Sequence, residues 1–591
     1  MTTHSNRKST TKTTSAKTTV DVTPLTDILT VGVAAREMTA LANKLADLRT
    51  RMEVLTDCCS GAQAEAYNRH RQIFNTKFQF RPSAIFLPQT TDDVAEVVKI
   101  AASFPTLVRL RARSGGHDHE GECSGTDTWV IDFNKMTAIT RDEKASRPPE
   151  LNVVRIQAGT VFRQIKATMD QWNLGIPHGT CATVSPTGYT LGGGWGPWTR
   201  RYGMSCERLI GATVVKGDGS IINASVDDLP GSEGARLLWA LRGGGGFSYG
   251  IVTELMYNAF ELPSEAHSFQ VSFVNEAGEP DRSAISVLRD WERMVAGDNY
   301  PNLTGTNLMI SATHIDKYAT PDPDAKLMST FNGYYAGAVE EIHKLIRDAF
   351  GEQYLPRLRI REYIKSNENG VRKIDESWHF HSWDRIAGTV HADGEEITID
   401  PSIQLEQEGP APHKITSRLA DEKGWDEESR RALICTLQSP LAAPVSVGGT
   451  FGVHCYITIG AIAGPFYSSR TGRESTAHIA FPYTRRPFTL QFQAWWDQFY
   501  GPNGEPVEKA SPTIIHKNTL ANRPWINRAE DWIEACRDAR IPHTSGAFIS
   551  FKDDAVKTEV YFAQHYDDLR RVKRECSADP HLLFQTRKTI I

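Results

Sequence analysis

The chain has 591 residues, 40% of them hydrophobic and 23% charged, with a formal net charge of −5 and a pI near 6.4. This length allows about three or four domain-sized units, and the composition is that of a folded globular protein. The slight excess of acids excludes a nucleic acid or a membrane surface as an electrostatically held partner, and no apolar run reaches the roughly 18 residues of a membrane span.

Residues 1–24 are predicted to be a disordered tail. The first 20 are rich in Thr, Ser and Lys, contain no acid and lack the apolar centre of a secretory signal, which leaves an organelle transit peptide as the alternative. The nine cysteines show no Cys-x-x-Cys spacing, and their odd number without a secretory signal favours a reducing compartment, the cytoplasm.

Residues 25–57 are predicted to form a helix, because apolar residues recur there mostly at steps of three and four. A strand is expected at 80–88, followed by a helix over 92–102 that Thr91 caps and that carries acids in its first turn. Further strands are predicted at 108–113, 130–133, 153–158 and 210–215, and after the glycine-dense run 238–253.

The pattern changes after about residue 263, where short strands alternate with helices predicted at 282–295 and 339–350. Residues 357–424 are polar and are predicted to be irregular, with Trp378, His379, His381 and Trp383 clustered within them. Apolar strands are predicted at 451–462 and 488–492, and a basic helix near the end of the sequence.

Two glycine-dense turns each carry one nucleophilic side chain. His117 closes the run Arg111-Ala-Arg-Ser-Gly-Gly-His117, and Cys181 lies near the start of the run Gly179–Gly196. With a third glycine loop at 243–250, these turns could surround a pyrophosphate and a flat ring, because glycine lets backbone N–H groups approach a ligand. Neither a Walker A motif nor a Rossmann Gly-x-Gly-x-x-Gly is present, so a dinucleotide would need another fold.

These motifs resemble those of the berberine-bridge-enzyme-like branch of the vanillyl-alcohol-oxidase superfamily, which has a PCMH-type FAD-binding domain. The pattern R-x-R-S-G-G-H-x-x-x-G matches Arg111–Gly121, and G-x-C-x-x-V-x-x-x-G-x-x-x-G-G-G-x-G matches Gly179–Gly196. The resemblance implies an α+β fold in two parts. An FAD domain would comprise 25–262 and return at 545–591, and a substrate domain at 263–544 would hold an antiparallel sheet backed by helices.

The resemblance also implies FAD bound through two covalent links. His117 would bond the flavin 8α-methyl group through a ring nitrogen, and Cys181 would form a thioether at C6. The other residues that the resemblance places at the cofactor are Arg113, Ser114, Gly115, Gly116, Gly121, Gly179, Thr180, Val184, Gly188, Gly192, Gly193, Gly194, Gly196, Tyr202, Gly203, Gly250, Val252 and Tyr566. No metal site is expected, because His117, His119 and Glu120 lack further recognisable ligands.

The family pattern breaks where a catalytic base is expected. In the family, a hydride passes to flavin N5 while a base, often Glu or Tyr, removes a proton; here Gln491 and Phe492 stand at those positions. Glutamine is not a useful base near pH 7. The candidates are therefore Tyr456 and Tyr483, for which core packing is the competing role, and Gln491 would orient a hydroxyl-rich substrate.

The resemblance predicts an oxidase acting on a sugar, an alcohol or a secondary metabolite. Val184 matches the family position that controls oxygen access, and a small side chain there favours O2 as the acceptor, giving H2O2. The alternatives are a dehydrogenase that uses another acceptor and a non-catalytic protein that retains flavin. The expected partners are a small-molecule substrate and O2, without nucleic acid or membrane, and the sequence indicates no oligomeric state.

Overall fold

The computed structural model describes residues 23–57, 60–145, 151–275, 277–296, 300–366, 372–374, 389–390, 396–397, 412–442, 453–469, 478–496 and 523–591. The chain divides into two compact units between Thr50 and Arg51. Residues 1–22 of the predicted tail and the cluster from Trp378 to Trp383 lie outside the described residues.

The first unit is formed by helix α1 (Thr23–Arg51), which begins inside the predicted tail. The predicted helix over 25–57 ends early, because Val54 and Leu55 are buried in strand β1 (Glu53–Leu55), which pairs antiparallel with β2 (Ala84–Leu87). Pairing and burial with β2 therefore override the helical periodicity at these positions. Within the described ranges, no helix is both long enough and apolar enough to cross a lipid bilayer.

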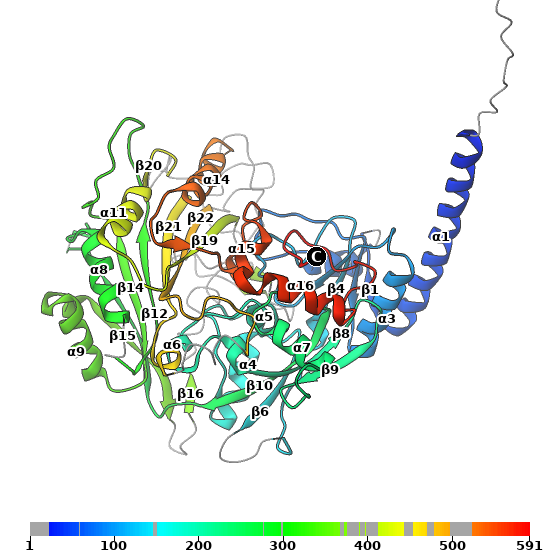
Figure 1. Ribbon diagram of the computed structural model, residues 1–591, viewed down its shortest axis with the longest axis horizontal. Coiled ribbons are helices and arrows are strands. Elements are labelled where there is room, and N and C mark those ends of the chain that lie inside the picture. The colour runs from blue at the N-terminus through cyan, green and yellow to red at the C-terminus, as the bar shows by residue number, and fades with distance from the viewer. Residues whose placement is uncertain are drawn as a thin grey trace, which may run out of the picture. The chain divides into compact units, whose positions relative to one another are not determined.

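The second unit contains three large sheets (Figure 1). The first has the strand order β1-β2-β4-β3, in which β2 and β3 (Leu110–Arg113) both run parallel to β4 (Trp129–Asp132). Helices α2 (Ala62–His70) and α3 (Thr91–Ser103) precede β2 and β3. Thr90, not Thr91, caps α3: its side chain accepts from Asp93 N, and the Asp93 carboxylate accepts from Thr90 N.

The second sheet is antiparallel, with the order β5-β6-β10-β8-β9 and a short strand β7 on β10. Its strands are β5 (Ile139–Arg141), β6 (Asn152–Gln157), β7 (Leu174–Gly175), β8 (Leu209–Val215), β9 (Ile221–Ser225) and β10 (Ile251–Glu261). Helices α4 (Phe162–Met169), α7 (Glu233–Leu241) and α16 (Tyr566–Glu575) share its hydrophobic core. The segment after residue 545 therefore packs with residues 150–260.

The third sheet is antiparallel with nine strands in the order β16-β15-β11-β14-β12-β21-β22-β19-β23. The strands are β11 (Ala266–Ser272), β12 (Leu303–Ser311), β14 (Ser329–Tyr335), β15 (Leu358–Ser366), β16 (Arg372–Ile374), β19 (His413–Ala420), β21 (Val453–Ala461), β22 (Phe488–Trp496) and β23 (Thr544–Ser545). Residues of α8 (Ala284–Val295), α9 (Val339–Phe350), α11 (Glu427–Thr436) and α14 (Arg523–Asp538) bury one face of it. In Figure 1, α8, α9 and α11 lie along one side of β12, β14 and β21.

The remaining elements are short. They are α5 (Pro186–Leu191), α6 (Thr199–Tyr202), α12 (Pro465–Ser468), α15 (Thr558–Phe562), the 3₁₀ helices η1 (Phe133–Lys135), η2 (Asp170–Trp172), η3 (Ser205–Arg208), η4 (Glu352–Arg357), η6 (Ile549–Phe551) and η7 (Ala563–His565), and the paired strands β13 (Thr313–His314) with β20 (Gln438–Ser439) and β17 (Thr389–Val390) with β18 (Glu396–Ile397).

The strands predicted to begin near 130, 153, 210, 451 and 488 are present within a few residues of their expected bounds. The irregular region predicted at 357–424 is wrong at both ends, where β15 and β19 form. β19 lies between β22 and β23, and Ser417 there satisfies its buried hydroxyl through the backbone of Phe548. The division into an FAD domain and a substrate domain stays a prediction.

Candidate functional site

His117 lies at the end of a tight loop that follows β3. After Arg113 the chain turns through Ser114, Gly115 and Gly116, and Gly116 has φ +74°, a left-handed conformation that favours glycine. The His117 ring stacks on Phe74 with centroids 4.0 Å apart, and its Nε2 lies 2.8 Å from Thr183 Oγ1. These contacts hold the imidazole against the loop that carries Cys181.

The His117 imidazole is neutral at pH 7. Burial lowers its pKa to about 3, and the neighbouring His119 and Arg113 act in the same direction. One ring nitrogen therefore keeps its lone pair, which is the form of imidazole that can act as a nucleophile.

The half-buried Cys181 belongs to the loop between β7 and α5. This loop and the His117 loop meet at Gly115, where a Cβ atom would lie 2.5 Å from Thr183 O and 2.8 Å from Ser185 N. The contact is backbone to backbone, so only glycine permits it without a shift of either loop. The structure thus brings together the two predicted attachment loops, with Thr180 and Val184 on the partly exposed part of the second loop.

Arg113 fixes the start of the first loop through contacts with Asp132 and His70. Its guanidinium forms an ion pair with Asp132 at 2.5 Å and donates to the carbonyl oxygen of His70 at 3.1 Å. Burial alone would raise the pKa of Asp132, but Arg113 and the hydrogen bond from His70 hold it below its ordinary value. The hydrogen bonds of this predicted cofactor residue thus go to protein groups.

The glycines of the second motif fall into two groups. A Cβ atom at Gly192, Gly194 or Gly196 would lie within 2.5 Å of Ser550, Ser205 or the His178 carbonyl oxygen, respectively, and Gly193 has φ +111°. Gly188 is exposed, and a Cβ atom added there would have no neighbouring atom within 4 Å. A Cβ atom added at Gly179 would lie 3.4 Å from its nearest neighbour, the ring of Tyr189. The inner glycines serve the packing of the chain itself, and Gly188 borders open space.

Tyr189 was missed by the sequence analysis because it occupies a variable position of the motif. Its ring meets Phe162 edge-on, with centroids 5.2 Å apart. Its hydroxyl is buried, has no hydrogen-bond partner among the described residues, and has its pKa raised by that burial. This hydroxyl lies against Gly196, where a Cβ atom would come within 2.8 Å of it.

The other predicted cofactor residues lie in packed regions. Gly121 has φ +71° and is covered by the rings of Phe78 and Phe80. Tyr202 stacks on Phe260 at 3.8 Å, while Val252 and Tyr566 pack with the core of the second sheet. Gly203 and Gly250 have φ +83° and +134° and lie under Phe466 and Val214.

Tyr456 reaches the attachment loops from the third sheet. It is buried in a cluster with Phe74, whose ring stacks on His117, and with Ala182, which follows Cys181. Its hydroxyl donates to Gln493 Oε1 at 3.1 Å, and Trp495 Nε1 donates to the same oxygen at 3.0 Å.

Gln491 and Tyr483 are placed differently. Gln491 lies on the same face of β22 as Gln493, is buried, and has its Nε2 3.4 Å from Thr489 Oγ1. Tyr483 packs in another cluster with Phe481, its hydroxyl donates to the Val560 carbonyl oxygen, and burial raises its pKa to about 12. Of the two tyrosines, only Tyr456 shares the cluster beside His117.

His413 is a second residue that the sequence analysis missed, because it opens a strand that was predicted to be irregular. The buried ring stacks on Trp495 with centroids 3.9 Å apart, and its Nε2 lies 2.9 Å from His119 Nδ1. The pair links the His117 loop to the third sheet. Polar and apolar residues do not alternate over 413–420, so no local signal in the sequence marks this strand.

Three carboxylates, Glu120, Asp553 and Asp554, have oxygens within 4.8 Å of one another. Arg587 lies 3.3 Å from Glu120 and 3.2 Å from Asp554, and Arg537 lies 2.9 Å from Asp553. These guanidinium groups already supply the positive charge, so the cluster has the character of an ion-pair network.

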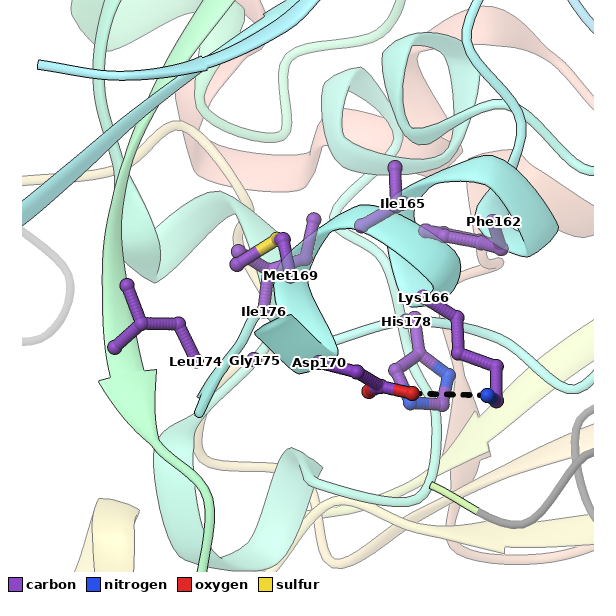
Figure 2. Close-up of a pocket in the computed structure, with 9 residues that line it drawn as sticks. All are labelled: Phe162, Ile165, Lys166, Met169, Asp170, Leu174, Gly175, Ile176 and His178. Carbon is purple, nitrogen blue, oxygen red and sulfur yellow. Dashed lines mark hydrogen bonds and ion pairs between the residues drawn. The ribbon is translucent and has the colours of Figure 1, made fainter. Parts of the chain in front are cut away.

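A small pocket (Figure 2) is lined by apolar residues of α4 and β7 and by His178, Lys166 and Asp170. The Lys166 ammonium pairs with Asp170 at 2.9 Å. Trp198 Nε1 donates to His178 Nε2, so Nδ1 carries the proton and donates to the Gly179 carbonyl oxygen at 2.7 Å. His178 thus supports the start of the Cys181 loop from within.

Residues 82–225 match the family described as FAD binding domain. Glucooligosaccharide oxidase from Sarocladium strictum is 31% identical over 256 residues, which cover 43% of this chain and 47% of that protein. The matched part of berberine bridge enzyme-like 3 from Arabidopsis thaliana is 43% of its length, at 29% identity. The chain therefore spans about half the length of these curated relatives.

Solved structures extend the likeness over most of the chain. A chitooligosaccharide oxidase superposes with a TM-score of 0.63 at 17% identity, covering 93% of this chain and 99% of that one. A berberine bridge enzyme variant in complex with (S)-reticuline gives a TM-score of 0.66 at 18% identity, with coverage of 93% and 98%. A glucooligosaccharide oxidase from Acremonium strictum, described as carrying 6-S-cysteinyl, 8α-N1-histidyl FAD, gives 0.65 at 18% identity with the same coverage. The α+β fold implied by the resemblance is confirmed, as is FAD as the cofactor of the matched domain.

Proposed function

We propose that this chain is a berberine-bridge-enzyme-like FAD-linked oxidase, and that it oxidises a neutral, hydroxyl-rich small molecule with FAD linked to both His117 and Cys181. The observation that carries the proposal is the meeting of the two loops at Gly115, together with the 2.8 Å contact between His117 and Thr183. The doubly linked FAD named for the similar glucooligosaccharide oxidase supports it.

The residues present fit a flavin. His117 offers a neutral imidazole and Cys181 a half-buried thiol, which are the two nucleophiles that the links require. Gly188, in the same motif as Cys181, borders open space. When bound, FAD supplies the acceptor for a hydride.

Tyr456 is proposed to receive the proton of the substrate hydroxyl as a phenolate, after releasing its own proton to solvent. In the protonated state its hydrogen is directed to Gln493 Oε1. Gln493 is itself fixed, because its Nε2 donates to Thr458 Oγ1 at 3.1 Å. Tyr456 would therefore be oriented by amide and hydroxyl groups, without a charged partner in these contacts.

The sheet face around Tyr456 favours a neutral polar substrate. Strands β12, β21 and β22 contain no Asp, Glu, Lys or Arg. Their polar side chains on this face include Asn307, Thr458 and Gln491, which both donate and accept hydrogen bonds. Trp195 lies against Gly460 of the same face and adds an aromatic surface. Amides, hydroxyls and aromatic rings suit a sugar, whereas a charged substrate would lack an ionic partner on these strands.

The proposed acceptor is O2, which would leave as H2O2. Val184 supports this, because it is small and its side chain remains partly exposed beside the Cys181 loop. A dehydrogenase would instead bleach with substrate and regain its colour slowly in air. A flavin-retaining binding protein would stay yellow with every substrate.

Mass spectrometry tests the attachment. The purified protein is denatured and digested, and a single flavin is expected to join the peptides that contain residues 117 and 181. Aerobic peroxide production with a panel of neutral sugars, phenols and alkaloids then tests the activity. A white acid precipitate, with all pigment in the supernatant, would contradict the proposal.

A further inference from the structure

The five residues after His117, Asp118–Glu122, form a short strap that other parts of the chain hold in place. Asp118 Oδ1 accepts from the backbone N–H groups of Glu120 and Glu122 at 3.0 and 3.1 Å, which makes the strap a compact turn. Because His117 immediately precedes it, any shift of the strap moves the imidazole.

The inner side of the strap is fixed through Asn75. Its Nδ2 donates to the carbonyl oxygens of His119 at 2.6 Å and His413 at 3.1 Å, and its Oδ1 accepts from His413 N. Phe74, the preceding residue, stacks on the His117 ring. These contacts fix the position of the strap relative to β19 of the third sheet.

The outer side is held by the segment after residue 545. Lys552 Nζ lies 2.6 Å from Asp118 Oδ2. Burial alone would raise the pKa of Asp118, but the Lys552 ammonium holds it below its usual range, so the pair stays charged.

Arg587 makes the largest number of these outer contacts. Its Nε donates to Glu122 Oε1 at 2.5 Å, its backbone N–H to Glu122 Oε2 at 2.9 Å, and its Nη2 to the Glu120 carbonyl oxygen at 2.8 Å. Its Nη1 reaches Asp554 at 3.2 Å. The two Glu side chains are less than one-tenth exposed, so their charges depend on this partner.

We propose that Arg587 is a positioning residue for flavin attachment: it holds the strap so that the His117 ring nitrogen meets the flavin methyl group. The planar guanidinium bonds three groups of the strap at once, which an ammonium at the same place could not do. The inference rests on the proposed double linkage, and it assigns Arg587 to the His117 bond rather than to the Cys181 bond.

The link at His117 is an oxidative coupling. One N–C bond forms, and one hydrogen is lost from the imidazole nitrogen and one from the flavin 8-methyl group. The two electrons and two protons released pass to O2 and give H2O2. The chain contributes only the position and the neutral state of the imidazole.

The test compares the two links within one sample. Wild type, Arg587→Gln and Arg587→Lys are purified as holoprotein, digested, and assayed by mass spectrometry for flavin on the peptides with residues 117 and 181. In Arg587→Gln, the fraction linked at His117 is expected to fall about tenfold, because small misplacements of a reacting group are costly. The fraction linked at Cys181 is expected to stay at the wild-type level, and Arg587→Lys to give an intermediate His117 fraction.

Arg571→Gln is the matched control, because Arg571 is exposed on α16 and pairs with Asp568 in the same segment. It should leave both links intact. The inference is overturned if both links persist in Arg587→Gln, or if the two fall together, which would indicate a general folding defect. An absence of links in the wild type would instead refute the proposed function. If Arg587→Gln does not accumulate, an unchanged His117 fraction in Arg587→Lys overturns the inference equally.

Discussion

At the scale of single residues, the hydroxyl of Tyr456 carries the proposed proton transfer. Tyr456→Phe removes the acceptor while retaining the ring that packs with Phe74 and Ala182. We expect kcat to fall about 10²- to 10⁴-fold, the usual contribution of a general base. Flavin content and both covalent links should be unchanged, as measured by absorbance and peptide mapping.

Tyr483→Phe is the matched variant. It removes a hydroxyl whose pKa is raised to about 12 and that donates to the Val560 carbonyl oxygen in another cluster. We expect kcat within about twofold of wild type and a loss of stability of about 1–3 kcal/mol, because a buried acceptor loses its partner. A kcat loss as large as that of Tyr456→Phe would contradict the choice between the two tyrosines.

The residues differ in how far the sequence could identify them. His117 and Cys181 stand within long, specific patterns, so their pairing could be predicted without a structure. Arg587 and His413 could not be predicted, because their partners lie 465 and 294 residues away along the chain. Tyr189 stands inside a motif, yet only burial of its hydroxyl without a partner distinguishes it.

At the scale of elements, the two loops depend on their contact at Gly115. In Gly115→Ala the new methyl group would lie 2.5 Å from Thr183 O, so the loops must separate. We expect a stability loss of about 1–3 kcal/mol from overpacking, and a fall in the fraction of doubly linked flavin. Thermal unfolding and peptide mapping would measure the two effects.

Gly246→Ala controls for the substitution itself, since a Cβ there would make only an ordinary 3.5 Å contact with Leu191. Its melting temperature should stay within about a degree or two of wild type, and its flavin linkage should be unchanged. If Gly115→Ala behaved in the same way, close approach of the loops would not be required.

The elements also show where the spacing of apolar residues predicts a helix or strand and where it does not. Helix α9 and strand β21 were predicted within two residues because each has one apolar face with a regular period. β19 was missed because it is an interior strand whose Ser417 and Arg418 bond to the backbone of residues 536–551, contacts that no local pattern reports.

At the scale of the whole molecule, buried histidines make stability depend on pH. Burial lowers the pKa of His178 to about 4, against a small opposing effect of the Gly179 carbonyl. The His178 side chain therefore binds a proton near pH 6.5 in the unfolded chain, but only near pH 4 in the folded chain. The contribution of His178 to the free energy of unfolding is fully present above pH 6.5. It decreases as the pH is lowered from 6.5 toward 4, by about 1.4 kcal/mol per pH unit.

His178→Gln should remove this pH-dependent contribution to stability. Its melting temperature is expected to decline less steeply than that of wild type between pH 6.5 and 5, by the equivalent of about 2 kcal/mol. His119, whose pKa burial lowers to about 4, contributes equally to both proteins, and Glu120, whose pKa burial raises to about 7, opposes the trend in both. Parallel curves for the two proteins would show that His178 does not carry the proton linkage.

The strap of residues 118–122 also sets an order of events during synthesis. Glu122 emerges 465 residues before Arg587. At about 5–20 residues per second, a ribosome needs roughly 25–90 s to cover that interval. Throughout it the nascent polypeptide carries its imidazole and thiol without the guanidinium that steadies the neighbouring turn. If Arg587 positions the His117 link as proposed, that link is expected to form efficiently only after Arg587 has been translated, and stalled chains that lack it should carry less flavin at His117 than at Cys181.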